Sequence, residues 1–214
     1  MTESDLVAAL RPVAEAFDDL GVRYYLGGSV ASSAHGIARA SLDADLVAML
    51  EPDHVDRLVA RLASTYYIPV DRLRSAVAAR SSCNFIHLAT MFKIDVFVSQ
   101  GRPFDRQAAE RAREYAIDEA PDAPRFPVAS AEDTVLAKLE WFRLGGEASE
   151  RQWWDVVGVL KVAEDARPRI SPTLGRLAGR VGPPRPRAGR RRAPVERRVA
   201  RATRSSQRSR RSRT

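Results

Sequence analysis

Two aspartates, Asp43 and Asp45, are separated by a single residue within the apolar segment 42–50. The composition of this segment predicts a β-strand, in which positions i and i+2 point to the same face. The two carboxylates should therefore lie side by side, where they repel each other unless a cation neutralises them. Mg²⁺ is a hard cation that prefers oxygen ligands and also binds phosphates, so the pair suits a magnesium site. The alternative is a polar strand face exposed to solvent.

A glycine-rich turn, Gly27-Gly28-Ser29, follows the apolar segment 22–26 and precedes a short helix expected over residues 29–35. Glycine allows the backbone to approach a phosphate closely. The free amides at the start of the helix, together with the Ser29 hydroxyl, can bind phosphate oxygens. Most Gly-Gly-Ser turns are only turns, so this motif gains meaning from the aspartates that follow it.

A third acidic residue, Asp95, lies in the segment 91–98, whose apolar residues alternate with Lys93, Asp95 and Phe97. The alternation predicts a second strand with Lys93 and Asp95 on the same face. Taken alone, these two side chains could form an ordinary surface ion pair. Beside Asp43 and Asp45, a third carboxylate from a neighbouring strand suits a general base, or a ligand of a second metal ion, in an attack on a nucleoside triphosphate.

The order of these motifs resembles the DNA polymerase β-like nucleotidyltransferase superfamily. The match extends over residues 20–100 and consists of the Gly-Gly-Ser turn, a gap that contains Arg39 and Ser41, the Asp-x-Asp pair and the later strand aspartate. The chain is similar in particular to small bacterial members, among them the AbiEii-type toxins of toxin–antitoxin systems and the minimal nucleotidyltransferases.

The resemblance implies which residues would carry the activity. The turn would bind the nucleotide triphosphate through Gly27, Gly28 and Ser29. The third acid would also activate the acceptor. All three acids would be catalytic and metal-binding and would hold two Mg²⁺ ions, with Mn²⁺ as a substitute; they are Asp43, Asp45 and Asp95.

A second part of the resemblance lies in the C-terminal third of the chain. Lys138 on an expected helix, followed by the segment Arg151-Gln-Trp-Trp-Asp155, is similar to the AbiEii-type pattern of a helix lysine followed by Arg-x-x-x-Asp. In that pattern the lysine contacts nucleotide phosphates and the aspartate lies near the site. The alternatives are an exposed Lys138 and a simple ion pair between Arg151 and Asp155, which are one helical turn apart.

The periodicity of the chain predicts an α+β fold, and the resemblance adds a mixed β-sheet of the nucleotidyltransferase type flanked by helices. Helices are expected over residues 4–20, 29–35, 52–64, 70–79, 104–113, 131–144 and 149–162, and strands over 22–26, 42–50, 84–88, 91–98, 115–119 and 125–128. The expected organisation is a core over residues 1–128, a helical hairpin packed on it over 129–165, and a disordered basic tail over 166–214.

The charges of the chain divide between the body and the tail. Residues 166–214 contain 17 arginines and one acid, Glu196, which leaves 18 of the 35 basic and 26 of the 27 acidic residues in residues 1–165. The net charge of +8 therefore argues for nucleic-acid contact only through the tail. The tail has too few apolar residues to build a core. It could equally have no specific role, or be the product of a frame change in a GC-rich gene.

The remaining features concern the cellular location of the protein and the roles of its cysteine, His35 and tryptophans. A single cysteine, Cys83, excludes an internal disulfide and fits a reducing cytoplasm. No run approaches the roughly 20 apolar residues of a membrane helix, and the N-terminus lacks a signal-peptide segment, so a cytoplasmic location without membrane contact is expected. His35 is expected to be a helix-end residue, and the tryptophans are expected in the core or facing a partner: Trp141, Trp153 and Trp154.

These features together predict the transfer of a nucleoside monophosphate from a nucleoside triphosphate to an acceptor hydroxyl, with release of pyrophosphate. The acceptor stays open between tRNA, a partner protein and a small molecule such as an aminoglycoside. Two other classes also stay open. One is a non-catalytic nucleotide-binding or antitoxin-like module, and the other is a nucleic-acid-binding protein that acts through its tail.

Overall fold

The N-terminal helix α1 (Asp5–Leu20) begins and ends where its sequence specifies. The Ser4 hydroxyl accepts a hydrogen bond from the Val7 amide, and Gly21 ends the helix in the left-handed conformation, with φ of 68°. The apolar stripe of α1 is buried. The computed structural model describes residues 4–36, 41, 43–118, 123–146 and 149–165, and of residues 163–165 only the backbone.

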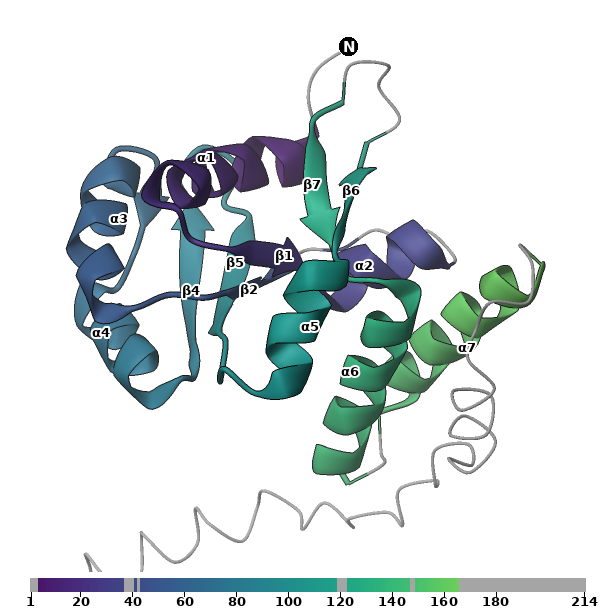
Figure 1. Cartoon of the computed structure of the whole chain (residues 1–214). Helices are drawn as coiled ribbons and strands as arrows, with labels where there is room; N and C mark the ends of the chain where they lie inside the picture. The colour runs from purple at the N-terminus through teal and green to yellow at the C-terminus, as the bar shows by residue number, and fades with distance from the viewer. Residues whose placement is uncertain (1–3, 37–40, 42, 119–122, 147–148, 166–214) are drawn as a thin grey trace, which may run out of the picture. The chain divides into compact units, whose positions relative to one another are not determined.

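A mixed seven-stranded sheet lies at the centre of the described residues (Figure 1). Its strand order is β3-β4-β5-β2-β1-β7-β6. The pairs β2/β5 and β1/β7 are parallel, whereas the other neighbouring pairs are antiparallel. The α+β class with a mixed sheet is therefore confirmed. The strands are β1 (Tyr24–Leu26), β2 (Asp43–Ala48), β3 (Tyr66–Tyr67), β4 (Ser82–His87), β5 (Lys93–Val98), β6 (Arg113–Ala116) and β7 (Arg125–Val128).

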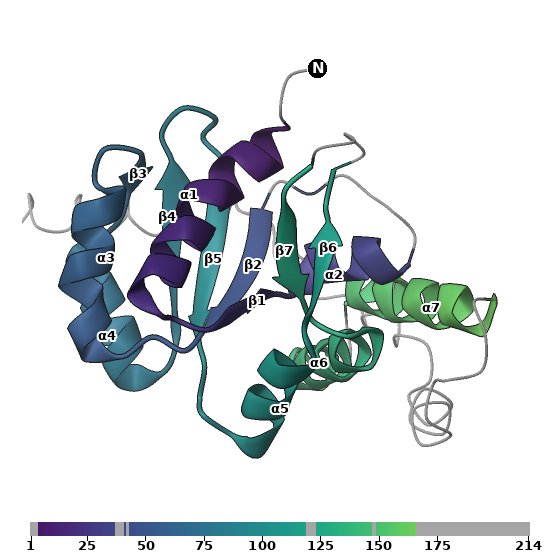
Figure 2. The same cartoon turned by 45° about the horizontal axis from the view of Figure 1, so that its top comes forward.

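The helices α1, α3 and α4 cover the part of the sheet around β4 and β5, whereas α6 and α7 lie away from them, beyond β1 (Figure 2). The predicted helix after Pro52 begins as a 3₁₀ turn and ends at Leu62, two residues earlier than expected. After α1, the helices are α2 (Gly28–His35), the 3₁₀-helix η1 (Pro52–His54), α3 (Val55–Leu62), α4 (Val70–Ala79), α5 (Pro103–Arg111), α6 (Ala131–Leu144) and α7 (Glu150–Asp165).

The central strands β2 and β5 have one buried and one partly exposed face. Burial alternates along both strands, as the sequence predicted. Because paired positions of neighbouring strands share a face, every residue in register with a partly exposed position is also partly exposed. The core face carries only apolar residues, which are Ala44, Leu46, Ala48, Ile94, Val96 and Val98.

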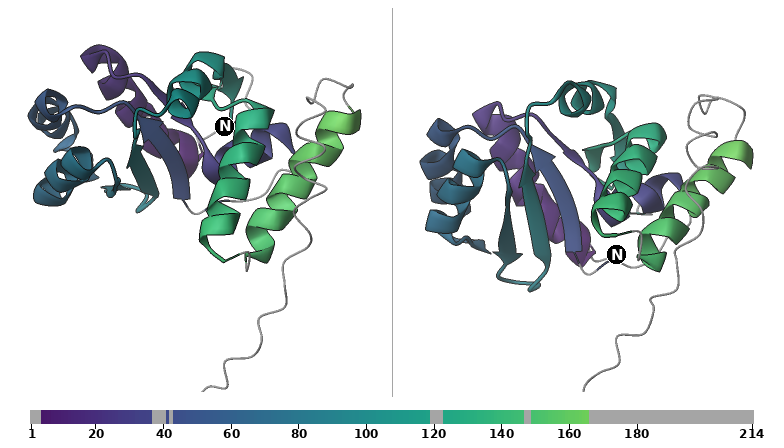
Figure 3. Two further views of the ribbon diagram at one scale, coloured as in Figure 1. Left: turned by 60° about the horizontal axis from the view of Figure 1, so that its bottom comes forward. Right: turned by 90° about the horizontal axis from the view of Figure 1, so that it is seen from below.

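The C-terminal helices α6 and α7 form the predicted hairpin (Figure 3). Ser130 caps α6 by accepting a hydrogen bond from the Asp133 amide at 3.1 Å. A small apolar cluster joins the two helices, and α2 packs against both. The boundary expected at residue 128 stays a prediction, and the expected tail lies outside the described residues. In the part of the chain that is described, no helix combines the length and apolar character needed to cross a membrane.

Candidate active site

The three predicted acids share the partly exposed face of the central strands. Asp43 and Asp45 lie on β2, and Asp45 is in register with Asp95 on β5. From the other side, Asn84 on β4 is also in register with Asp95. The structure therefore brings together acidic residues that lie far apart in the sequence.

Lys93 lies between two of these carboxylates. Its Nζ donates to Asp95 Oδ2 at 2.7 Å and lies 3.6 Å from Asp43 Oδ2. The hydrogen bond to Asp95 is the main cause that raises the pKa of Lys93. The other oxygen of Asp95, Oδ1, is buried and has no hydrogen-bond partner among the described residues. The expected Lys93–Asp95 pair is thus present, but it leaves one carboxylate oxygen for a further ligand.

The surroundings of Asp45 disfavour the charged form of its carboxyl group. Burial raises the pKa of Asp45, and the negative charges of Asp43 and Asp95 raise it further. The positive charge of Lys138 and a hydrogen bond from the Ser29 amide act in the opposite direction. A carboxylate with this combination of burial and like-charged neighbours is typical of a functional site.

The raised pKa of Asp45 predicts how stability depends on pH in an Asp45→Asn variant. Below the ordinary carboxyl pKa of about 4, Asp45 is protonated in both the folded and the unfolded chain. As the pH rises through the higher pKa of the folded state, the unfolded chain loses its proton more readily, so the wild type loses stability that the variant retains. Urea unfolding at about pH 4 and about pH 7 should show a gap in favour of the variant that widens with pH. A gap that narrows would contradict this electrostatic picture.

The glycine turn packs directly on Asp45. The Gly27 amide donates to the carbonyl oxygen of Asp45 at 2.9 Å. Gly28 has φ of 53°, in the left-handed region that favours glycine. A β-carbon at Gly28 would lie 1.6 Å from Asp45 Oδ2. The predicted turn is therefore present, and only a residue without a side chain lets it approach this carboxylate.

Ser29 is connected to the acidic face through a second serine. Its hydroxyl lies 2.7 Å from the hydroxyl of Ser41, which donates to Asp43 Oδ1 at 3.2 Å and to the Asp43 carbonyl oxygen at 2.8 Å. Ser29 is buried. Its hydroxyl therefore helps to orient Asp43 in this structure, and the direct phosphate contact expected for it stays a prediction.

Lys138 approaches the site from α6. Its Nζ donates to Asp155 Oδ2 on α7 at 2.8 Å, and the two side chains are only 11% and 9% exposed. The alternative of an exposed Lys138 is therefore wrong. Since its charge also lowers the pKa of Asp45, Lys138 connects the hairpin electrostatically with the acidic face.

An Asp155→Asn variant should destabilise the protein, because it removes the charge that compensates the buried Lys138. Breaking a buried ion pair from one side costs about 3 kcal/mol. Urea unfolding should therefore show a loss of this order. As a matched control, Asp53→Asn changes an exposed aspartate of η1 and should leave stability nearly unchanged. Equal stability of the two variants would show that Lys138 does not depend on Asp155.

A cavity of about 710 Å³ opens over the partly exposed face of the sheet. This volume lies within the range of about 300–1,000 Å³ that is common for small-molecule sites. Strand β2, strand β5, the glycine turn and helix α6 all contribute to the cavity, through Gly27, Gly28, Asp45, Phe97, Lys138 and Trp141 among others. Asp45, the turn and Lys138 therefore line one cavity.

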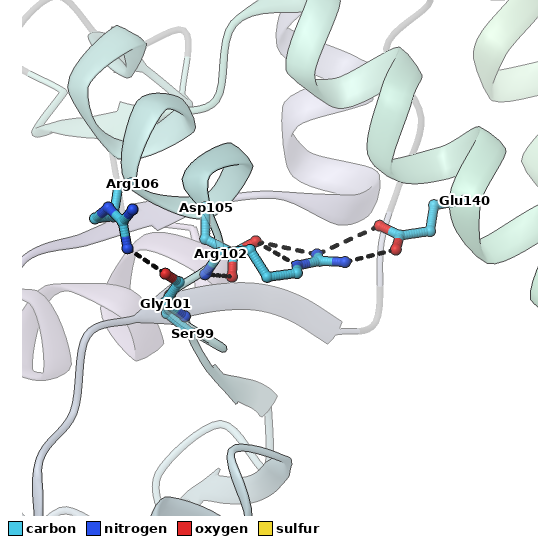
Figure 4. Close-up of polar contacts among 6 residues, drawn as sticks. All are labelled: Ser99, Gly101, Arg102, Asp105, Arg106 and Glu140. Carbon is cyan, nitrogen blue, oxygen red and sulfur yellow. Dashed lines mark hydrogen bonds and ion pairs between the residues drawn. The ribbon is translucent and has the colours of Figure 1, made fainter.

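An arginine network fixes one wall of the cavity (Figure 4). Arg102, in the loop after β5, donates to Asp105 Oδ1 at 3.0 Å and to Glu140 Oε1 at 2.7 Å. Since Asp105 lies on α5 and Glu140 on α6, one guanidinium joins the two helices. Arg106 donates to the carbonyl oxygen of Gly101 and so holds the same loop. These contacts position α6, with its lysine, beside the sheet.

Comparison with solved structures finds the same architecture in nucleotidyltransferases. The antibiotic-resistance factor ANT(2'')-Ia, in complex with adenylyl-2''-tobramycin, matches with a TM-score of 0.52 and 11% identity, over 83% of this chain and 97% of that chain. An antigenic nucleotidyltransferase-like protein from Paracoccidioides brasiliensis matches with a TM-score of 0.52 and 18% identity, over 83% and 88%. The chain has the nucleotidyltransferase fold. No protein-family model and no curated protein matches the sequence.

This nucleotidyltransferase fold confirms the resemblance read from the motifs at the level of the superfamily's fold. The more specific AbiEii type stays a prediction. Because the sequence identities are low, the likeness concerns the architecture, and the activity has to be argued from the residues of the site.

The cavity is also lined by residues to which the sequence assigned no role in a site. Gln152 on α7 lines the cavity, and its Oε1 is buried without a hydrogen-bond partner among the described residues. Phe97 and Trp141 line the same cavity with ring centroids 6.1 Å apart, and Trp141 is half exposed. The signal available for Gln152 was its position one helical turn before Asp155, which places both side chains on one face of α7.

His35 and Trp153 have the structural positions expected for them, whereas the core position expected for Trp154 is wrong and a partner contact for it stays a prediction. His35 lies at the end of α2, and its Nε2 is 2.6 Å from the carbonyl oxygen of Ala129. Burial raises the pKa of the Cys83 thiol, which makes this cysteine a poor nucleophile. Trp153 packs near Phe142, whereas Trp154 is exposed.

The acidic face suits a divalent cation by its chemistry, although its ligand set is incomplete. Among the described residues, no group of three or more His, Cys, Asp or Glu side chains is arranged to hold an ion by itself. The available donors are carboxylate oxygens, and the ammonium of Lys93 already lies between Asp43 and Asp95. One of these oxygens, Asp95 Oδ1, is buried and lacks a hydrogen-bond partner within the described ranges. Mg²⁺ commonly takes one or two carboxylates and completes its shell with substrate phosphates and water. The residues therefore fit this ion.

Proposed function

We propose that the protein is a magnesium-dependent nucleotidyltransferase that transfers a nucleoside monophosphate from a nucleoside triphosphate to an acceptor hydroxyl. One observation supports this above all others: three aspartates share a face of a nucleotidyltransferase-fold sheet where a glycine turn packs on Asp45. A merely solvated strand face does not explain the close approach of Gly28, or why the buried Asp95 Oδ1 has no hydrogen-bond partner in the part of the chain that the structure describes.

The chain's own residues would divide the work between binding and proton transfer. The turn at Gly28, together with Lys138, would hold the triphosphate, because backbone amides and lysine are favourable partners of phosphate oxygens. The amide of Gly27, also expected to bind phosphate, already donates to the carbonyl oxygen of Asp45. Asp95 Oδ1 would accept the proton of the acceptor hydroxyl as the hydroxyl oxygen bonds to the α-phosphorus. The bond from the α-phosphorus to the bridging oxygen would break, and pyrophosphate would leave with the electron pair.

The divalent ions, Mg²⁺ or Mn²⁺, would be held by Asp43, Asp45 and Asp95. When bound, such an ion neutralises phosphate charge and polarises the reacting phosphoryl group. A bound ion would stabilise the charged form of Asp45, because its positive charge would offset the burial and the repulsion by Asp43 and Asp95 that raise the pKa of Asp45. The hydrogen bonds that run from Ser29 through Ser41 to Asp43 would keep that carboxylate in place.

We propose a small-molecule hydroxyl as the acceptor. The cavity beside Asp45 has the volume of a small-molecule site, and ANT(2'')-Ia, whose structure contains adenylyl-2''-tobramycin, has the same fold. The other acceptors, tRNA and a partner protein, stay predictions, as does a role in a toxin–antitoxin system. Nucleic-acid contact through residues 166–214 and a cytoplasmic location also stay predictions.

A screen with α-phosphate-labelled nucleoside triphosphates tests this function. The purified protein and Mg²⁺ are incubated with an aminoglycoside panel, total tRNA or cell extract, and label transfer is followed. We expect transfer to a small molecule and its loss in the Asp43→Ala/Asp45→Ala double variant. Transfer to tRNA or to a protein would change the acceptor class, whereas triphosphate binding without transfer to any acceptor would indicate a non-catalytic module.

A further inference from the structure

Lys93 occupies the position of a counter-ion on the acidic face. Its ammonium contacts Asp95 Oδ2 at 2.7 Å and lies 3.6 Å from Asp43 Oδ2. The sheet register produces this arrangement, because Lys93 is paired with Asp43 across β2 and β5 and shares a face with Asp95 two residues later. The lysine therefore lies on β5, one of the two strands that carry the acids it contacts.

The charges on this face do not balance. Among the described residues, three carboxylates lie near the ammonium of Lys93, whereas the other nearby lysine, Lys138, forms an ion pair with Asp155 and acts on Asp45 only through its charge. The ammonium also contacts only one oxygen of Asp95 and leaves Oδ1 buried without a partner in the described residues. A doubly charged ion would neutralise more of this negative charge than a lysine does. The lysine thus stabilises the acids only in part.

The Lys93 side chain is also able to move away from the two carboxylates into solvent. It is 36% exposed, whereas that of Asp95 is 16% exposed. Lysine has a flexible four-carbon stem and a strongly hydrated head group, so an ammonium at the solvent boundary can move into water at little expense. Asp95, on the central strand β5, cannot move in this way.

We propose that Lys93 is an internal counter-ion that competes with divalent cations for Asp43 and Asp95 and thereby sets the affinity of the site. This inference rests on the metal site of the proposed function. A divalent ion bound to these carboxylates would repel the ammonium that lies beside them, so binding of the ion weakens the ion pairs of Lys93. Removing the lysine should therefore tighten the binding of the cation, although it removes a favourable contact from the cation-free protein.

Titration of the full chain with Mn²⁺ alone, followed by electron paramagnetic resonance, tests the competition without any nucleotide or turnover. We expect Lys93→Met to bind Mn²⁺ about three- to fivefold more tightly than the wild type, since this is the size of effect that an ion pair at the solvent boundary has. Lys93→Arg should bind it more weakly, because a guanidinium holds carboxylates through two hydrogen bonds. Lys161→Met, which removes an exposed lysine of α7, is the matched control and should leave the affinity unchanged.

Thermal unfolding supplies a second measurement that does not depend on the titration. Lys93→Met should unfold at a lower temperature than the wild type without cation, and saturating Mn²⁺ should raise its melting temperature by more than it raises that of the wild type. If the wild type binds Mn²⁺ and Lys93→Met binds it equally or more weakly, the counter-ion role of Lys93 is overturned. The proposed function is not affected by that result. Tighter Mn²⁺ binding by this variant, in a protein that transfers no nucleotide, would instead uphold Lys93 and overturn the proposed function.

Discussion

Asp45→Asn is expected to reduce nucleotidyl transfer by at least about 1,000-fold while raising the melting temperature of the protein. Asparagine has nearly the same shape as aspartate and can still accept the hydrogen bond from the Ser29 amide. It cannot supply the negative charge that holds a cation on this face. The same change removes a charge that burial and the neighbouring Asp43 and Asp95 disfavour, which is why the folded protein should gain stability.

The two effects of Asp45→Asn have to be measured on the same sample. Label transfer reports activity, and thermal unfolding with circular dichroism reports stability. The control is Asp53→Asn, an exposed aspartate of η1, which should change neither. A variant that is both inactive and less stable would point to a structural role of Asp45. A variant with near-normal transfer would remove the basis of the enzyme proposal.

Much of the fold was predictable because its elements are specified locally. Gly21 ends α1 and Ser130 caps α6 at the ends that the sequence predicts, whereas Ser4, expected as the first residue of α1, caps that helix instead. The alternation along β2 and β5 also follows from the sequence, since strand faces repeat every second residue. For the same reason Asp43 and Asp45 were expected on one face. That Asp95 would join them depended on the family resemblance, because strand order is not a local property.

The features that depend on long-range packing could not be read from the sequence. The ion pair between Lys138 and Asp155 depends on how α6 and α7 are aligned along their lengths. The sequence also allowed a local ion pair between Arg151 and Asp155 within α7. The interaction of Lys93 with Asp43 follows from the parallel register of β2 and β5, which periodicity does not specify. The cavity and Gln152 in its wall are likewise products of how the hairpin packs beside the sheet.

Gly28→Ala is expected to reduce transfer by at least about 100-fold and to destabilise the fold by about 3 kcal/mol. Its β-carbon would lie 1.6 Å from Asp45 Oδ2 and 2.5 Å from Asp45 Cγ, in a backbone conformation that alanine rarely adopts. Either the carboxylate or the turn has to move, and both belong to the proposed site. Displacement of a reacting group by about 1 Å is enough for a loss of this size.

The neighbouring glycine provides a close control for this prediction. A β-carbon at Gly27 would have Val47 Cγ2 as its nearest neighbour, at 4.0 Å, so Gly27→Ala should fold and transfer nearly normally. In an Asp45→Ala background the two closest clashing atoms are absent, so Gly28→Ala should cost less stability there than in the wild type. Measured by urea unfolding, such coupling would show that Gly28 is required by the carboxylate. An equal loss of stability in the two backgrounds would mean that the backbone conformation alone requires glycine at position 28. The close approach of the turn to Asp45 would then not be the reason for this glycine.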